Sequence, residues 1–250
     1  MENVFRLRYD VYCEERNYLP SADYPLEMEA DEYDRDATHF IVYGTDPRPM
    51  GYMRTVPADD SGSFPVFNHG LLPFRDLRLP HPDIAVECSR LMVRPDVRMQ
   101  EVGVSFPQHL ILPHPPAQNA SALIQMKLVR MAYRNALETN VRCFHAALEP
   151  PLARRLNRLG FPLKPIGPPG EYFGAVTPYL MDLREMEHGM RSQAPLTWAF
   201  FNNPSDDPHS ITYRPGEWSM PRGLEINEGL HDDQVRLRDT RDPQHGLRFN

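Results

Sequence analysis

Two charged residues, Glu87 and Arg90, interrupt a short hydrophobic segment at residues 84–93 (IAVECSRLMV). The pattern is that of a buried strand, in which a carboxylate and a guanidinium each cost several kcal/mol to remove from water. That cost is avoided when the charges are paired, hydrogen bonded or facing a wet cleft. The segment therefore predicts a strand that borders a functional site.

The spacing of these two charges poses a geometric problem. Side chains of a strand alternate between its faces, so residues three apart should point to opposite sides. A β-bulge at Cys88 or Ser89 would re-aim one of them and interrupt the ladder of hydrogen bonds. We therefore expect a bulge there, which would open a substrate-binding notch in the sheet.

Other residues offer weaker chemical signals. His145 and Glu149 lie four residues apart on a predicted strand, so their side chains share a face. They are either a catalytic pair or, as we favour, His145 has a structural role. Cys88 as a nucleophile would need a neighbouring base, and the sequence shows none. The motifs GxSxG, GxGxxG, GxxxxGK[ST] and HExxH are absent, so serine hydrolases, dinucleotide-binding enzymes, P-loop proteins and zincins have no support.

The composition is that of a folded chain without a membrane span. The 250 residues are 41% hydrophobic, and no apolar run reaches the roughly 18 residues that would cross a bilayer. The first ten residues, MENVFRLRYD, are too charged for a secretory signal. Cys13, Cys88 and Cys143 have no CxxC spacing, which argues against disulfides and a zinc site. We expect a cytoplasmic protein with no bound metal.

The charge is unevenly distributed along the chain. A formal net charge of −7 disfavours nucleic acid as a partner. Residues 121–164 are nevertheless basic, with eight lysines and arginines against two glutamates. This segment is either a solvated helix face or a docking surface for an acidic macromolecule or a phosphorylated cofactor.

The elements that must position these residues follow from periodicity and from turn residues. The predicted helices are residues 3–16, 120–140 and 150–160, the last one opened by proline and closed by Gly160. The predicted strands are residues 39–44, 50–57, 84–93, 143–149, 162–167 and 171–183. Proline-rich residues 57–83 and residues 94–119 are read as loops. The order indicates an α+β or α/β domain, with helices flanking a mixed sheet.

Two regions are distinguished along the chain. Residues 1–186 alternate apolar segments with turns and are predicted to form one domain. Residues 187–250 lack a sustained period, apart from an apolar patch at residues 196–201. They are predicted to be a partly irregular C-terminal extension.

Four ordered groups of residues resemble a known enzyme family. They are Arg8-x3-Tyr12-x5-Tyr18, Glu29-x-Asp31-x-x-Asp34, Gly51-x-x-Arg54 and Glu87-x-x-Arg90. Their order and spacing resemble the acyl-homoserine lactone (autoinducer) synthases, which carry Phe and Trp where this chain has Tyr12 and Tyr18. The blocks RLRYDVYCEERNYL, EADEYD, ECSRLMV and AALEPPLARRLNRLGFPLKPIGPPGEYFG resemble their relatives more closely. These relatives are the PEP-CTERM/exosortase system-associated acyltransferases and the long-chain N-acyl amino acid synthases. The resemblance covers about residues 4–182.

The resemblance implies a GNAT-type α+β fold, in which two central strands part at a bulge and the pantetheine arm of an acyl thioester lies between them. Residues 84–93 and 143–149 would be those strands. Glu87 would be the catalytic base for the incoming amine, and Arg90 would orient that carboxylate or the acceptor.

The resemblance also implies roles for the remaining site residues. Four residues would help to bind substrate as an ion-pair cluster that orders the loop over the acceptor site; they are Arg8, Asp31, Asp34 and Arg54. The residues expected to line the substrate site are Tyr12, Tyr18, Cys88, Ser89, Leu91, Met92 and Val93. Arg94 and Arg98 are the candidates for binding the donor.

The resemblance implies that the donor would be either acyl carrier protein or acyl-CoA. The segment RPDVRMQEVG matches the phosphate-cradling loop of coenzyme A users weakly, which favours acyl carrier protein. The expected activity is transfer of a medium- or long-chain fatty acyl group to an amine of an amino acid, an amino lactone or a peptide. A dedicated homoserine-lactone signal synthase is one alternative. A non-catalytic module that binds acyl thioesters or a protein partner is another.

Overall fold

The protein is built on one mixed sheet. The computed structural model describes residues 1–99, 120–204, 208–224 and 226. Eight strands form the sheet, in the order β5-β7-β4-β3-β2-β1-β8, with β6 pairing β7 at one end. The β3–β4 pair is parallel and the other pairs are antiparallel. The strands are β1 Thr38–Tyr43, β2 Pro49–Val56, β3 Ala85–Val93, β4 Cys143–Leu148, β5 Lys164–Pro165, β6 Gly170–Glu171, β7 Ala175–Asp182 and β8 Ser210–Tyr213.

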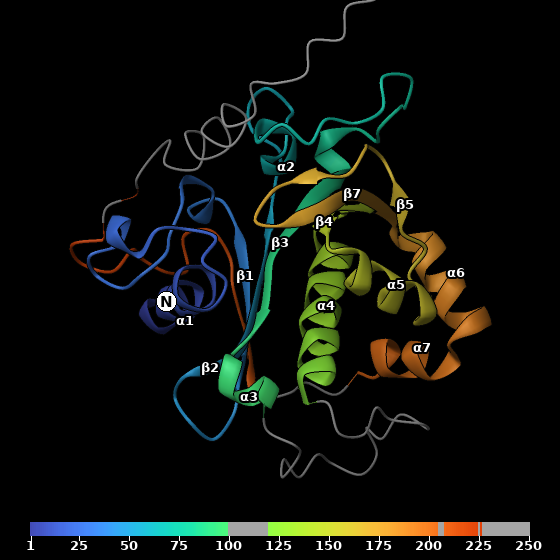
Figure 1. The fold of residues 1–250 in the computed structure, drawn as a ribbon. Coiled ribbons are helices and arrows are strands. Elements are labelled where there is room, and N and C mark those ends of the chain that lie inside the picture. Colours follow the sequence, from blue (N-terminus) through green and yellow to red (C-terminus); the bar gives the residue numbers. More distant parts are fainter. Residues whose placement is uncertain (100–119, 205–207, 225, 227–250) are drawn as a thin grey trace, which may run out of the picture.

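Helices cover both faces of the sheet. Figure 1 shows α1 on one side of β1 to β3, with α4 and the shorter helices α5 to α7 on the other. The α-helices are α1 Glu2–Tyr9, α2 Pro65–Asn68, α3 Pro95–Met99, α4 Ala120–Glu138, α5 Pro150–Arg158, α6 Leu183–Gln193 and α7 Pro195–Asn202. The single turns are a π-helix η1 Asp10–Glu15 and three 3-10 helices, η2 Ser21–Asp23, η3 Glu32–Asp34 and η4 Pro82–Ile84. None of the helices in the described ranges is long and apolar enough to cross a membrane.

The largest apolar cluster lies between the sheet and α4. Ile124 and Leu128 of α4 are no more than 1% exposed, and they pack with Phe40 of β1 and Phe144 of β4. Gly51 of β2 permits this close approach, because a Cβ atom there would lie 2.3 Å from Cγ2 of Ile124. The fold therefore fixes α4 against the centre of the sheet, beside the strand that carries Glu87.

The predicted elements agree with those observed over most of the first 186 residues. The predicted helix at residues 3–16 is α1 followed directly by η1, and the predicted strands correspond to β1 to β4 and to β5 and β7. Residues 100–119, part of the predicted loop at 94–119, lie outside the described residues. So do residues 227–250 of the predicted extension.

The remaining part of the predicted C-terminal extension is more regular than its composition indicates. Helix α6 crosses the predicted boundary at residue 186, and α7 follows it. Phe200 and Phe201 of α7 are buried in the main cluster. Strand β8 pairs with β1 in the same sheet. Tertiary contacts with the sheet therefore order segments that show no local period.

Candidate active site

Strand β3 contains the expected bulge, but it lies one or two residues beyond the predicted position. Tyr52 pairs with Met92 and Arg54 pairs with Ser89, so Met53 of β2 faces two residues, Arg90 and Leu91. Arg90 has φ +58°, the left-handed conformation that one class of bulge has at its first residue, usually a glycine. The bulge predicted at Cys88 or Ser89 is therefore at Arg90–Leu91. This position re-aims Arg90 itself.

Strands β3 and β4 part at Glu87. Their parallel ladder has three residue pairs and ends with Glu87 opposite His145. Beyond this pair β3 continues to Val93 and β4 to Leu148, but they no longer pair with each other. A cleft of ≈ 420 Å³ lies at this point, with Glu87 in its wall.

Most of the predicted site residues line this cleft. They are Tyr12, Tyr18, Glu87, Cys88, Ser89, Arg90, Leu91, Met92, Val93 and Arg98. The opposite wall comes from the end of β4 and from α5, including Leu148 and Leu152. The lining of the cleft therefore mixes apolar side chains with polar and charged ones, among them the buried carboxyl group of Glu87.

Glu87 has the surroundings of a general base. Its side chain is 1% exposed, and its Oε2 accepts a 2.7 Å hydrogen bond from the backbone N–H of Val66 in α2. Burial raises the pKa of Glu87 to about 7, although the Val66 N–H and the positive charges of Arg54 and Arg90 act to lower it. A carboxyl group with this pKa can both take and release a proton near neutral pH.

His145 is a buried neighbour of Glu87 with no catalytic geometry of its own. The centre of its ring lies 4.5 Å from the ring centre of Phe64 and 5.4 Å from that of Phe67. Neither ring nitrogen of His145 has a hydrogen-bond partner in the part of the chain described. Burial lowers the pKa of His145 to about 4. Glu149, its proposed partner, instead begins α5 and accepts a 3.4 Å hydrogen bond from the hydroxyl of Tyr18.

Cys88 lines the cleft as a protonated thiol. Burial raises its pKa, and the charge of Glu87 raises it further. A nucleophilic cysteine needs the opposite shift, so the surroundings of Cys88 disfavour that role.

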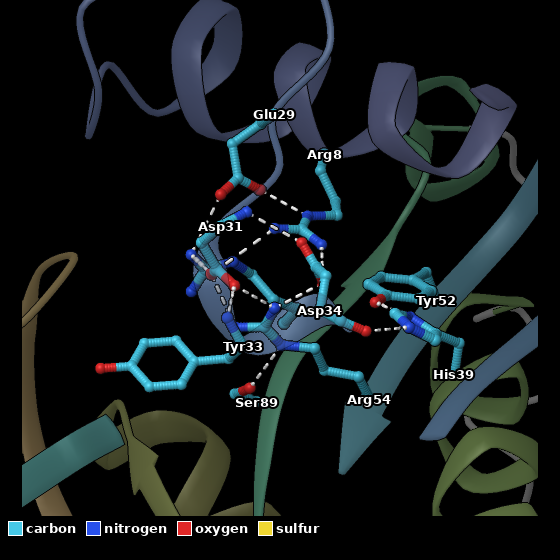
Figure 2. Close-up of polar contacts among 10 residues, drawn as sticks. Arg8, Glu29, Asp31, Tyr33, Asp34, His39, Tyr52, Arg54 and Ser89 are labelled. Atoms are coloured by element: carbon cyan, nitrogen blue, oxygen red, sulfur yellow. Dashed lines mark hydrogen bonds and ion pairs between the residues drawn. The ribbon is translucent and has the colours of Figure 1, made fainter. Parts of the chain in front are cut away.

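Three arginines and three carboxylates form a buried cluster behind the cleft (Figure 2). Its members, all at most 4% exposed, are Arg8, Glu29, Asp31, Asp34, Arg54 and Arg90. Arg54 bonds Asp31 through Nη1 at 2.6 Å and Nη2 at 2.7 Å, and Asp34 through Nη1 at 2.5 Å. Arg8 pairs with Glu29 and Asp34, and Arg90 pairs with Glu29 at 3.1 Å and Asp31 at 2.9 Å. The formal charges balance.

Local turn geometry positions the acidic half of this cluster. Asp31 is the N-cap of η3: its Oδ1 accepts the N–H of Tyr33 at 3.1 Å, and its own N–H donates to Oδ2 of Asp34 at 2.8 Å. The backbone carbonyl of Asp34 in turn contacts Nε2 of His39 at 3.0 Å, and Nδ1 of that ring lies 2.7 Å from the hydroxyl of Tyr52. These contacts attach residues 29–34, the acidic segment, to β1 and β2.

The cluster lowers the pKa of two of its carboxyl groups, those of Glu29 and Asp31. Burial alone would raise the pKa of Glu29, but Arg8 and Arg90 outweigh it and lower that pKa to about 2. Burial opposes the charged form of Asp31 as well, and Arg54 and Arg90 outweigh it to lower its pKa. The predicted ion-pair cluster thus forms. Arg8, Asp31, Asp34 and Arg54, which were predicted to bind substrate, do not line the cleft.

Arg90 joins the cluster to the cleft. Its guanidinium lies 4.7 Å from the ring centre of Tyr12 and 4.8 Å from that of Phe173. No hydrogen bond joins Arg90 to Glu87 within the described structure. Arg90 therefore contacts both the acidic segment and the aromatic side chains of Tyr12 and Phe173. It does not bond the carboxyl group of Glu87 directly.

The two predicted donor-binding arginines separate. Arg98 lines the cleft and pairs with Glu15. Arg94 directly follows the end of β3 and does not line the cleft. Its Nε pairs with Asp96 at 2.6 Å, and its Nη2 pairs with Asp46 at 3.5 Å. Of the two, only Arg98 is placed to meet a donor in the cleft.

Several residues of the site were missed in the sequence. Glu29 belongs to the cluster and had a signal, since it begins the quoted group Glu29-x-Asp31-x-x-Asp34. Tyr172 and Phe173, at the turn between β6 and β7, line the cleft, as does Arg155 of α5. An aromatic pair in a turn has no periodicity that marks it as functional, so local pattern could not reveal it.

A larger cavity of ≈ 560 Å³ lies elsewhere and contains none of the predicted site residues. Its walls include Asp59, Asp83 and Ala136. Within the described ranges no group of three or more His, Cys, Asp or Glu side chains is arranged to hold a metal ion.

Comparison with known proteins agrees with this architecture. Residues 7–106 match the family described as the acetyltransferase (GNAT) domain. The solved structure "The structure of a COA-dependent acyl-homoserine lactone synthase, BjaI, with SAM and isopentyl-CoA" is 21% identical over 82% of each chain, with a TM-score of 0.58. The fold is that of the GNAT acyltransferases.

Two further solved structures are similar. TofI in a ternary complex with an inhibitor and MTA is 19% identical over 78% of this chain and 91% of its own, with a TM-score of 0.54. The CoA-dependent acyl-homoserine lactone synthase MesI is 20% identical over 82% of this chain and 89% of its own, with a TM-score of 0.53. No curated protein sequence is similar enough to this chain to be matched.

These findings confirm the predicted GNAT fold.

Proposed function

We propose that this protein is an amide-forming N-acyltransferase that moves a fatty acyl group from a pantetheine thioester to an amine. The observation that carries the proposal is the position of Glu87, a buried carboxyl group with a pKa of about 7. It stands where β3 and β4 part, in the wall of a ≈ 420 Å³ cleft.

The proposed reaction starts with the acceptor amine. Its nitrogen attacks the thioester carbonyl carbon, and Glu87, directly or through one water, takes a proton from that nitrogen. A positioned base of this kind contributes about 10² to 10⁴ in rate. The carbon–sulfur bond then breaks, and the products are an amide and a thiol, the sulfur having taken up one proton. Backbone N–H groups freed at the Arg90–Leu91 bulge are the candidate donors to the carbonyl oxygen, each worth roughly 2.7 to 4 kcal/mol.

The donor is acyl-CoA or acyl carrier protein. Arg98 and Arg155 line the cleft and could meet the phosphate of the pantetheine arm. Two of the similar solved structures are CoA-dependent acyl-homoserine lactone synthases, which favours CoA by analogy. The basic segment at residues 121–164 is compatible with an acidic carrier protein. The acyl chain would lie among Leu91, Leu148 and Leu152.

The acceptor is an amine of an amino acid, an amino lactone or a peptide. The arginines of the buried cluster cannot bind an acceptor carboxylate, because each already pairs with acidic side chains and is at most 4% exposed. The cluster would instead fix the wall against which the acceptor binds. The aromatic side chains of Tyr12, Tyr18 and Phe173 form that wall.

Thiol release measured with purified protein tests the proposal. Acyl-CoA and acyl carrier protein donors of several chain lengths are combined with a panel of amines, and products are identified by mass spectrometry. Wild-type protein should release thiol in step with amide, and Glu87→Gln should lower the rate at least a hundredfold. Lipid extracts of an expression host should contain the same amides. If neither assay yields an acyl amide and no acyl thioester stabilises the protein, the proposal is wrong.

The same assay separates the alternatives. A homoserine-lactone signal synthase would consume S-adenosylmethionine and release methylthioadenosine, whereas the proposed enzyme would act on amines without it. A non-catalytic acyl-thioester-binding or partner-binding module would bind the thioester without turnover. Its cellular phenotype would survive Glu87→Ala.

A further inference from the structure

A segment between α2 and β3 exposes an unusual concentration of large apolar side chains. Leu72, Phe74 and Leu77 are 61%, 49% and 41% exposed. The other large apolar side chains with comparable exposure in the described structure are scattered over four separate elements or loops. Scattered apolar side chains on a surface are ordinary, but three within six residues form a local patch.

The segment is anchored at its base. Leu71 is buried against Ala85, Cys143 and Val176. The backbone N–H of Phe74 donates to the carbonyl of Ile166 at 2.7 Å. The backbone of Leu72 also lies close to Gly167, where a Cβ atom would be 2.4 Å from the Leu72 oxygen. The exposed side chains are therefore presented by a fixed backbone.

The charges beside these apolar residues are basic. Arg75 and Arg78 are both exposed, and neither has an ion-pair partner among the residues described. With Asp76 between them the segment carries +1, although the whole chain carries −7. Apolar side chains flanked by arginines match the boundary between acyl chains and anionic headgroups, where both can be satisfied at once.

The base of the segment also touches the cleft. His69, which ends α2, stacks on Tyr172 with ring centres 5.1 Å apart, and Tyr172 lines the cleft. Val66 of the same helix holds Glu87. Figure 1 shows the segment extending from α2 away from the sheet, at the top of the view. An acyl amide leaving the cleft would thus have an apolar surface near it.

We propose that residues 72–78 dock on a membrane surface that carries anionic lipid headgroups. Leu72, Phe74 and Leu77 enter the interfacial region, and Arg75 and Arg78 meet lipid phosphates. A lipid product would explain the purpose of such docking, and that part rests on the proposed function. The docking surface itself does not rest on it. An acidic donor protein fits residues 72–78 less well than a membrane does. The basic side chains proposed to meet the donor, Arg98 and Arg155, line the cleft and are not part of this segment.

Vesicle cosedimentation of the full chain tests this proposal. The probes are vesicles of phosphatidylglycerol and phosphatidylcholine in equal parts, and vesicles of phosphatidylcholine alone. Wild-type protein should bind the anionic vesicles at least tenfold more tightly, since each basic residue near such a surface contributes about fivefold. Raising the salt concentration should weaken the binding.

Two variants identify the surface. Leu72→Ser/Phe74→Ser/Leu77→Ser and Arg75→Glu/Arg78→Glu should each lose at least tenfold in binding to anionic vesicles. The matched control is Leu137→Ser/Leu196→Ser, because these leucines are 57% and 45% exposed on other elements. The control should bind as the wild type does. All three variants should keep the wild-type rate with a water-soluble acceptor, so a failure of docking is distinguishable from a failure of catalysis.

Three outcomes would overturn the proposal. The first is wild-type protein that stays in solution with both kinds of vesicle. The second is a triple serine variant that is folded by circular dichroism and still binds anionic vesicles like the wild type. The third is a complex with acyl carrier protein on gel filtration that Arg75→Glu/Arg78→Glu abolishes, together with no vesicle binding. That result would assign the segment to an acidic protein.

Discussion

Arg54 and Asp31 meet through two parallel hydrogen bonds of 2.6 and 2.7 Å in a region where each side chain is 1% exposed. The pair ties the acidic segment to β2, the neighbour of the strand that carries Glu87. Such pairs gain little relative to an apolar core, because both charges lose their hydration. Their specific geometry nevertheless fixes how the segment lies on the sheet.

Removing one partner of this pair should be strongly destabilising. Asp31→Asn leaves Arg54 and Arg90 with a deficit of buried negative charge, and the free energy of unfolding should fall by about 3–5 kcal/mol. Chemical denaturation measures the change. Asp46→Asn is the matched control, since the Asp46–Arg48 pair is exposed and should contribute under about 1 kcal/mol. Equal losses in the two variants would contradict a special role for the cluster.

The rate of acyl transfer should depend on the ionisation of Glu87. A base acts when deprotonated, and its pKa is about 7, so kcat/KM should fall about tenfold for each pH unit below 7. Two acceptors whose amines differ in pKa separate this effect from titration of the substrate. An acid limb that stays near pH 7 with both acceptors belongs to the protein. A limb near pH 4.5, or one that follows the amine, would remove Glu87 from the role of base.

The same ionisation should appear in the pH dependence of stability. The folded-state pKa of Glu87 is raised from 4.5 to about 7, so the folded protein binds an extra proton between these values. Its contribution to stability is therefore present below pH 4.5 and is lost as the pH rises through 7. Glu87→Gln, which cannot ionise, should gain on the order of 3 kcal/mol relative to the wild type between pH 4.5 and 8.

Thermal melts of both proteins across this pH range measure the difference. The buried His39 and His145, whose folded-state pKa values are lowered to about 4, act with the opposite sign: their contribution to stability is lost as pH falls from 6.5 to 4. Both histidines are present in the wild type and in the variant, so their effect cancels. Parallel melting curves would show that Glu87 has an ordinary pKa.

Packing of α4 on the sheet should tolerate no side chain at position 51. Gly51→Ala places a Cβ atom 2.3 Å from Cγ2 of Ile124, and the resulting strain should cost about 1–3 kcal/mol. Gly44→Ala is the control, because its Cβ meets only the flexible end of Met50 at 2.9 Å. Urea denaturation compares the two. An alanine at position 51 that costs no more than the control would show that α4 can shift.

Much of the fold and most of the cleft were predictable because their signals are local. The period of residues 120–140 and the short strands around Glu87 depend on neighbouring residues in the sequence. The bulge was predictable from the odd spacing of Glu87 and Arg90, but its position was not. Arg90, which has the left-handed conformation there, contacts Glu29, Asp31, Tyr12 and Phe173, and these residues come from distant parts of the chain.

The predictions that differed from the structure also depended on distant contacts. Arg94 follows β3 like a cleft residue, yet Asp46 and Asp96 hold it elsewhere. Residues 195–213 have no strong period of their own, and their helix and strand form against the main core and β1. Local sequence patterns predict the secondary structure of a residue more reliably than they predict its contacts in the folded protein.

Strand β8 has a consequence for the solubility of the chain. Its residues 210–213 pair with residues 39–42 of β1 and so occupy the hydrogen-bonding edge that β1 would otherwise expose. The residues of β1 covered in this way include Phe40, Ile41 and Val42. An uncovered apolar edge is a template for strands of other molecules. A shortened chain that ends before residue 210 should therefore self-associate, even though it would retain Glu87 and the whole cleft.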